Sequence, residues 1–262
     1  MTVSQRKIIF TATFLLLFFL TSFGWAADIS DLVSKRVSQD GKTLDLSGLN
    51  IGASGAKQLA KMDLLAGITA LHLQGNNIRA RGMKALAKSP HLAGLKHIDL
   101  WGNLLGDLGL KAISESPYLK QLETLKLWKN EISDDSIELM VVSGNFTHLK
   151  TLMLNDNLIT PAGAAMLAST SLFPQLLTLN LFSNDIGDGG ALAFASSKNF
   201  SSLELLYLGE NKITDQGAVT LIESQYFPRL KVLDLAMNPL GEATMMAAFK
   251  VNNKGKLQIV YR

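Results

Sequence analysis

Apolar residues recur at a fixed spacing along most of this chain. Two apolar residues separated by one position return in a 27-residue period, and an asparagine follows three positions after the second of them. The apolar pairs are Leu71/Leu73, Ile98/Leu100, Leu125/Leu127, Leu152/Leu154, Leu179/Leu181, Leu206/Leu208 and Leu233/Leu235. The asparagines are Asn76, Asn103, Asn130, Asn157, Asn184, Asn211 and Asn238. Seven copies in one unbroken register indicate an internal repeat, which at this period is typical of solenoids.

Each copy predicts one short strand followed by one helix. Alternating leucines place one face of a strand in the core, where it stacks on the copies before and after. The second half of a copy, for example residues 213–223, reads as a helix with Thr214 suited to its N-cap. The asparagine falls where the chain leaves the strand, and its amide can both donate to and accept from turn backbone groups. We therefore expect a ladder of asparagines along the stack.

One copy, residues 149–159, matches the leucine-rich-repeat pattern L-x-x-L-x-L-x-x-N-x-L. The continuation, Asp-x-Gly-Ala and then a full helix, resembles the ribonuclease-inhibitor-like leucine-rich repeats over about Leu44 to Arg262. The resemblance implies an α/β solenoid shaped as a horseshoe, with a parallel β-sheet on the concave face and α-helices on the convex face. Members of that family generally bind proteins. Only scaffold positions match, so the resemblance carries over no functional residue.

The N-terminal segment reads as a signal peptide over residues 1–26. Arg6 and Lys7 precede an apolar run at residues 8–20, and the small residues Gly24 and Ala26 favour cleavage after Ala26. An uncleaved anchor is the alternative, because a spanning helix needs about 20 residues. Either way the remaining chain faces away from the cytoplasm. We expect a bacterial protein that is periplasmic or secreted.

The rest of the chain divides into a stack and two caps. Residues 27–41 predict a capping helix, residues 42–256 eight repeats, and residues 257–262 a closing strand that begins 27 positions after Leu230. The first repeat has Leu49 where the asparagine belongs, as is common for terminal repeats. A glycine recurs in the helical half of most copies, for example Gly82, Gly163 and Gly190, where we expect the helix to crowd its neighbour.

Strand residues between the inward leucines face the open side of the predicted sheet. Trp101 and Trp128 occupy equivalent positions in neighbouring copies, on strands about 4.8 Å apart. Large aromatic residues on an exposed face favour a binding site, and tryptophan and tyrosine are enriched at binding hot spots. The predicted partner-binding residues are Trp101, Trp128, Lys126, Met153, Phe182, Tyr207, His72 and Asp99.

Alternatives remain open for these positions. The aromatic rings can pack on one another as cross-strand pairs do, and a sugar can also stack on them. The row Asp45, His72 and Asp99 either binds a metal or senses pH, or forms a solvated polar ladder. Asn145-Phe-Thr147 and Asn199-Phe-Ser201 match the N-glycosylation pattern, which repeat consensus explains equally well.

Composition narrows the function. The chain has no cysteine, which excludes disulfides, thiolate metal sites and a cysteine nucleophile. Its net charge of +3 falls to about +1 without Arg6 and Lys7, too little to argue for nucleic acid. We find no catalytic constellation, metal-ligand spacing or cofactor motif, and expect a monomer that touches a membrane only if its N-terminal segment stays uncleaved. The sequence predicts an exported scaffold that binds a partner protein, or alternatively a surface or secreted factor that binds glycan or host molecules.

Overall fold

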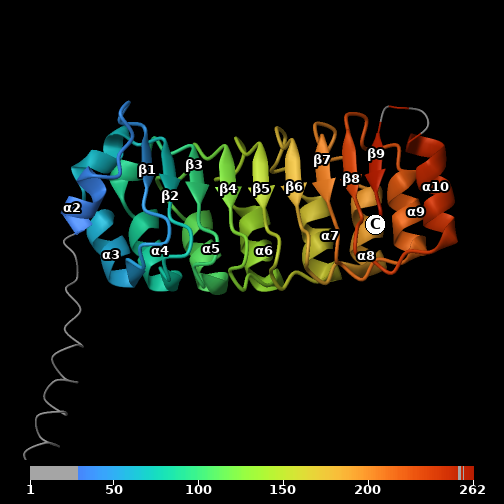
Figure 1. Ribbon diagram of the computed structural model, residues 1–262, viewed down its shortest axis with the longest axis horizontal. Coiled ribbons are helices and arrows are strands. Elements are labelled where there is room, and N and C mark those ends of the chain that lie inside the picture. Colours follow the sequence, from blue (N-terminus) through green and yellow to red (C-terminus); the bar gives the residue numbers. More distant parts are fainter. Residues whose placement is uncertain (1–28, 253–254, 256) are drawn as a thin grey trace, which may run out of the picture.

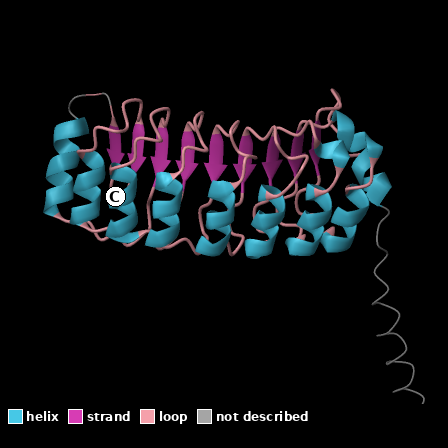
Figure 2. Cartoon of the chain, turned by 180° about the vertical axis from the view of Figure 1, so that it is seen from behind, coloured by secondary structure: helices cyan, strands magenta, loops and turns pink. Residues whose placement is uncertain are grey.

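The computed structural model describes residues 29–252, 255 and 257–262. The described chain is one elongated stack in which strands lie side by side in one layer and helices in a second layer (Figures 1 and 2). The predicted signal peptide at residues 1–26 lies outside the described residues. Among the described residues, no helix is both long and apolar enough to cross a membrane.

The strand layer is a parallel sheet whose strand order follows the sequence. Its nine described strands have three residues each, and they pair from β1 to β9 without a crossover. They are β1 Thr43–Asp45, β2 Ala70–His72, β3 His97–Asp99, β4 Thr124–Lys126, β5 Thr151–Met153, β6 Thr178–Asn180, β7 Leu205–Tyr207, β8 Val232–Asp234 and β9 Gln258–Val260. From β1 to β8, residues at equivalent positions of successive repeats are paired, as in Leu71 opposite Ile98, so the repeat period is also the sheet register.

The helical layer contributes one helix to each repeat. These helices are α3 Gly52–Leu59, α4 Arg79–Ala87, α5 Gly106–Ser114, α6 Asp134–Val142, α7 Pro161–Ser169, α8 Gly187–Ala195, α9 Asp215–Ile222 and α10 Glu242–Asn252. Two short 3₁₀ helices, Asp63–Gly67 and Pro90–Leu92, lie in the returning loops of the first repeats. Each helix packs on the helix before it, and the predicted α/β solenoid is therefore confirmed.

The core lies between the two layers. The middle residue of each strand is buried while its two neighbours are mostly left partly exposed, which is the alternation that the leucine pattern predicts. The second leucine of each pair is also buried, as are the phenylalanines Phe146 and Phe200 of the returning loops. Each repeat covers the apolar residues of its neighbours, so the core is continuous from end to end.

The expected asparagine ladder is present in the core. Asn130 is fully buried, and its Oδ1 accepts hydrogen bonds from the backbone N–H groups of Asn103 and Leu105 in the previous repeat. Its Nδ2 donates to the carbonyl oxygens of Leu100 and Trp128. One side chain thus forms hydrogen bonds with four backbone groups at the place where the chain leaves the sheet.

Glycine allows the helices to approach one another, as expected. A Cβ at Gly82 would lie 2.9 Å from the Cβ of Ala56 on α3, and one at Gly190 would lie 2.7 Å from the Cβ of Ala164 on α7. At Gly163 the nearest neighbour is not a helix Cβ but the carboxylate of Asp134, which a Cβ at this position would overlap. The glycine column therefore makes room for two kinds of neighbour.

The carboxylate of Asp134 belongs to a second ladder, which the sequence analysis missed. It accepts hydrogen bonds from the backbone N–H of Thr160 at 2.9 Å and from its hydroxyl at 2.5 Å. The Thr160 hydroxyl in turn accepts from the N–H of Ala162, so Thr160 caps α7. Asp188 and Thr214 repeat the arrangement at α9. Each aspartate of one helix thus fixes the start of the next helix.

The N-terminal capping helix is shorter than predicted, whereas the predicted closing strand is present as β9 but pairs out of the repeat register. The N-terminal helix α2 spans only Ile29–Ser34, and the chain then forms an antiparallel bridge between Val37 and Leu44. At the C-terminal end, the pairing of β9 with β8 falls one position short of the repeat period, which places Ile259 opposite Leu233. The side chain of Asn252 holds this register by binding the backbone N–H and carbonyl of Ile259. A shift of one position exchanges the two faces of a strand, so Ile259 is buried where the repeat frame points to Val260.

Candidate functional site

Two tryptophans lie at the centre of the strand face, the side of the sheet that points away from the helices. Trp101 and Trp128 lie two positions after the ends of β3 and β4, and their ring centroids are 5.0 Å apart at an interplanar angle of 27°. The side chains remain 40% and 41% exposed. The rings therefore stack on one another, as the alternative of cross-strand packing predicts. They still present a large apolar surface to solvent.

A charged pair borders the tryptophans. The ammonium of Lys126 lies 3.3 Å from the carboxylate of Asp99, whose other oxygen accepts the backbone N–H of Trp101 at 3.2 Å. Asp99 is only 8% exposed, unlike the exposed surface position that the sequence analysis gave it. Its geometry holds Lys126 and the Trp101 backbone in place, which leaves Lys126 as the charge that the surface presents.

The surface continues beyond the tryptophans over β5 to β7. Met153, Phe182 and Tyr207 are partly exposed there, each on a successive strand or the loop that follows it. Phe182 lies across the next repeat, since a Cβ at Gly209 would come within 2.3 Å of its ring. Gly209 therefore makes room for the ring, and sequence spacing alone could not have shown this.

Two amide side chains flank the tryptophans in the same column. The Oε1 of Gln74 and the Oδ1 of Asn155 are buried and have no hydrogen-bond partner within the described part of the chain. Buried polar atoms usually have a hydrogen-bond partner, so these two oxygens are acceptors whose hydrogen-bonding capacity is not used by the described residues.

In the polar row Asp45, His72 and Asp99, both carboxylates bind residues close to them. Both the hydroxyl and the backbone N–H of Ser47 donate to the Asp45 carboxylate, and these bonds hold the pKa of Asp45 below its ordinary value. His72 is partly exposed on the strand between Asp45 and Asp99. No group of three or more potential ligand side chains in the described segments is placed to hold a metal ion. The hydrogen bonds of the Asp45 and Asp99 carboxylates are instead made to residues outside the row.

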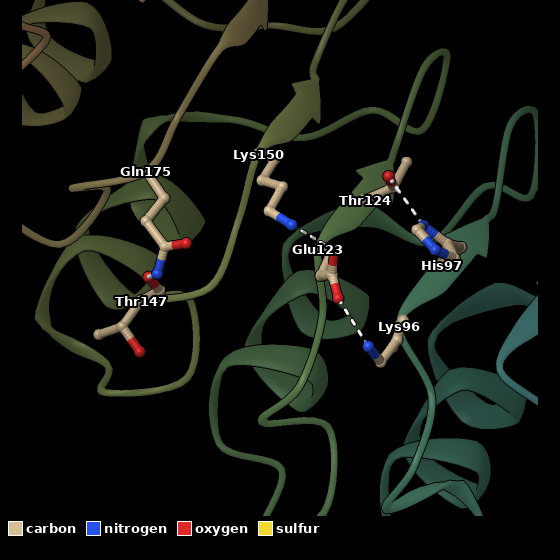
Figure 3. Close-up of polar contacts among 7 residues, drawn as sticks. All are labelled: Lys96, His97, Glu123, Thr124, Thr147, Lys150 and Gln175. Atoms are coloured by element: carbon tan, nitrogen blue, oxygen red, sulfur yellow. Dashed lines mark hydrogen bonds and ion pairs between the residues drawn. The ribbon is translucent and has the colours of Figure 1, made fainter. Parts of the chain in front are cut away.

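A charged column that the sequence analysis missed runs past the starts of β3 to β5 (Figure 3). Glu123 binds Lys96 from the previous repeat at 2.9 Å and Lys150 from the next repeat at 2.7 Å. These two ammonium groups lower the pKa of Glu123 to about 2. Beside it, Nδ1 of His97 lies 3.0 Å from the Thr124 hydroxyl. The repeat period was a signal for this column, because Lys96, Glu123 and Lys150 are spaced by it.

The two N-glycosylation patterns fall on structural asparagines. Asn145 is 7% exposed, and its Nδ2 donates to the carbonyl oxygens of Ile113, Ser114 and Ser116. The Nδ2 of Asn199 donates to the carbonyl of Ala168 in the previous repeat. This geometry supports the repeat-consensus explanation of both patterns.

Comparison with known proteins agrees with the repeat and the fold. The leucine-rich-repeat family model matches residues 68–87, 147–168, 174–195 and 201–221. No curated protein matches the sequence.

Two solved structures illustrate the similarity. An internalin from Listeria monocytogenes is 17% identical, with a TM-score of 0.52 over 89% of this chain and 63% of its own length. A Bacteroides fragilis protein is 15% identical, with a TM-score of 0.50 over 88% of this chain and 76% of its own. At such identities the likeness concerns the fold. The repeats, the sheet and these matches together define the chain as a leucine-rich-repeat solenoid.

Proposed function

We propose that this protein is an exported scaffold of the ribonuclease-inhibitor-like leucine-rich-repeat type that binds a partner protein through its strand face. The observation that carries the proposal is the stacked pair Trp101 and Trp128, 40% and 41% exposed on the outer side of the sheet. An ordered aromatic pair loses little conformational freedom on binding, and such residues supply most of the energy at binding hot spots.

The residues around the pair complete a typical interface. Lys126, fixed by Asp99, places one charge at the edge of the aromatic surface, where a complementary acid would improve specificity. Met153, Phe182 and Tyr207 extend the apolar area across three further repeats. Protein interfaces combine such an apolar centre with a polar rim.

The ring geometry favours a protein partner over a glycan. Sugars stack on the open face of an aromatic ring. Trp101 and Trp128 each turn one face toward the other, and their outer faces are flanked by the amide side chains of Gln74 and Asn155. The exposed remainder suits side chains that pack against ring edges and between strands. Glycan binding is the second candidate, because the unpaired oxygens of Gln74 and Asn155 are acceptors that sugar hydroxyls could fill after a side-chain rotation.

Export rests on the sequence of the first 26 residues. The order of basic, apolar and small residues supports a signal peptide cut after Ala26. The partner would then be met in the periplasm or outside the cell. Mass spectrometry of the protein recovered from cell fractions tests this. We expect Ala27 as the first residue in an extracytoplasmic fraction, and a full-length chain in the cytoplasm would contradict export.

The binding test replaces both tryptophans. Immobilised wild-type protein and Trp101→Ala/Trp128→Ala are each exposed to envelope extract, and the captured proteins are compared by quantitative mass spectrometry. We expect at least about a tenfold loss of specific capture, since hot-spot truncations cost about 2 kcal/mol or more. The matched control is Leu158→Ala/Leu192→Ala, which removes two side chains that are 58% and 54% exposed elsewhere.

Circular dichroism establishes that both variants remain folded. Unchanged capture by the folded tryptophan variant would refute the strand face as the binding surface. Retention of polysaccharide instead of protein, lost with the same variant, would favour the glycan candidate.

A further inference from the structure

The outer side of the helical layer carries a charge pattern that reverses between α4 and α6. Equivalent positions on α4, α5 and α6 recur at the repeat period, so each set forms a row across the three helices. The first row is Arg81, Leu108 and Asp135, and the second row is Lys84, Lys111 and Glu138. Thus α4 presents two cations at the positions where α6 presents two anions.

These four charges have no partner in the described part of the chain. Arg81, Lys84, Asp135 and Glu138 are exposed, and no ion pair within 4.0 Å involves any of them. Arg81 also lies in the first turn of α4, where the positive end of the helix dipole disfavours a cation. The local fold therefore gives no reason for an arginine there.

Apolar side chains accompany the charges. Leu108 on α5 is 71% exposed and Val142 at the end of α6 is 77% exposed. Between α4 and α5 lies a groove of about 400 Å³, lined by Arg81, Leu108 and small residues that include Ala87 and Ala112. The groove gives room for an apolar side chain from outside the molecule.

We propose that this face binds a second copy of the chain around a two-fold axis parallel to α5. Such an axis lies in the plane between the two copies and places α4 of one copy over α6 of the other. It also preserves the position of each row along the helices. Arg81 then faces Asp135 of the second copy and Lys84 faces Glu138. Leu108 and Lys111 on the central helix each meet their own equivalents, and the Lys111 ammonium is partly neutralised by Glu115 of its own helix at 3.7 Å. The same two ion pairs form twice, as an isologous interface requires.

The pattern fits a second copy better than other occupants. An anionic lipid surface or an acidic peptide would bind α4 but would be repelled by Asp135 and Glu138 on α6 of the same face. Only a surface with the reversed order of charges satisfies both helices, and the chain itself has that surface. Since the contact involves the helices, the two strand faces point in opposite directions and remain free.

The interface is small, so the association is weak. Three helices of nine residues are each about 14 Å long and about 10 Å apart, which gives roughly 400 Å² per copy. About 800 Å² in total lies at the lower limit for specific interfaces, where only weak and transient complexes form. We therefore expect dissociation constants in the micromolar range, and a weaker association at high salt because the charges are exposed.

A charge exchange tests the proposal by sedimentation velocity on the purified chain. Arg81→Glu/Lys84→Glu alone and Asp135→Arg/Glu138→Lys alone each place like charges opposite one another, and each should raise the dissociation constant at least about tenfold. An equimolar mixture of the two variants restores opposite charges in every pair. We expect the mixture to associate at least as well as the wild type.

The control Lys198→Glu/Lys250→Glu makes the same change in net charge on exposed residues outside the face, and it should dimerise as the wild type does. A wild-type chain that stays monomeric up to about 500 µM would overturn the proposal, because even weak specific interfaces associate by then. Failure of the mixture to associate while the wild type dimerises would equally overturn it, by placing the contact elsewhere. Neither outcome depends on the strand face or its partner.

Discussion

The interior of this solenoid and its strand face follow opposite rules. Inside, each repeat places two aliphatic residues, nearly always leucines, and usually an asparagine at equivalent buried positions. Asn103 and Asn130 make nearly the same hydrogen bonds. On the strand face, equivalent positions hold Gln74, Trp101 and Asn155, which share neither size nor polarity. Stacking requires identical neighbours, while recognition requires a surface that differs from place to place. Departures from the period therefore mark the candidate binding surface better than the period itself.

The interior rule is broken most severely by Asn130→Ala. The substitution removes four hydrogen bonds and leaves the buried backbone N–H groups of Asn103 and Leu105 without an acceptor in the described part of the chain, whereas the two carbonyl oxygens that Asn130 also binds each keep another donor. Each buried unsatisfied group costs about 1–3 kcal/mol, so we expect the free energy of unfolding to fall by about 4 kcal/mol. Urea denaturation followed by circular dichroism measures it. A loss below about 1 kcal/mol would show that the ladder does not stabilise the stack.

A smaller effect is expected from Gly82→Ala. The added Cβ would lie 2.9 Å from the Cβ of Ala56 and 3.1 Å from the Cα of Ala53 on the neighbouring helix. Overpacking costs about 1–3 kcal/mol, which exceeds the gain of up to about 1 kcal/mol from placing alanine in a helix. Gly94→Ala is the matched control, because nothing lies within 4 Å of its Cβ position. Equal stability of the two variants would mean that the helices can separate at no cost.

The smallest effect should come from the surface column at Glu123. Glu123→Gln removes the charge that Lys96 and Lys150 share, and exposed ion pairs contribute less than about 1 kcal/mol. Because the fold lowers the pKa of Glu123 from 4.5 to about 2, this contribution is complete above pH 4.5 and is lost as the pH falls toward 2. The stability difference between variant and wild type should therefore shrink below pH 4.5. A difference that grows in acid would contradict this assignment.

Sequence predicted the repeated features well, and for one physical reason. Burial and backbone satisfaction act on every copy alike, so seven copies reinforce one signal at residues such as Leu125 and Asn130. The candidate surface was predicted in position only. The sequence placed Trp101 beside Trp128, but it could not show that the rings stack or that Asp99 is buried, because side-chain rotamers depend on the neighbouring repeats.

The ends of the stack show the same division between features that the sequence predicts and features that depend on tertiary contacts. The sequence determined the 27-residue frame, the order of strand and helix, the buried leucines and the asparagine ladder, because these follow from periodic burial. Tertiary structure decided the rest. Asn252 shifts the register of the last strand by one position, and Asp134 fixes the start of the helix in the next repeat. Both are contacts of single side chains across repeats, and a pattern that averages over copies does not contain them.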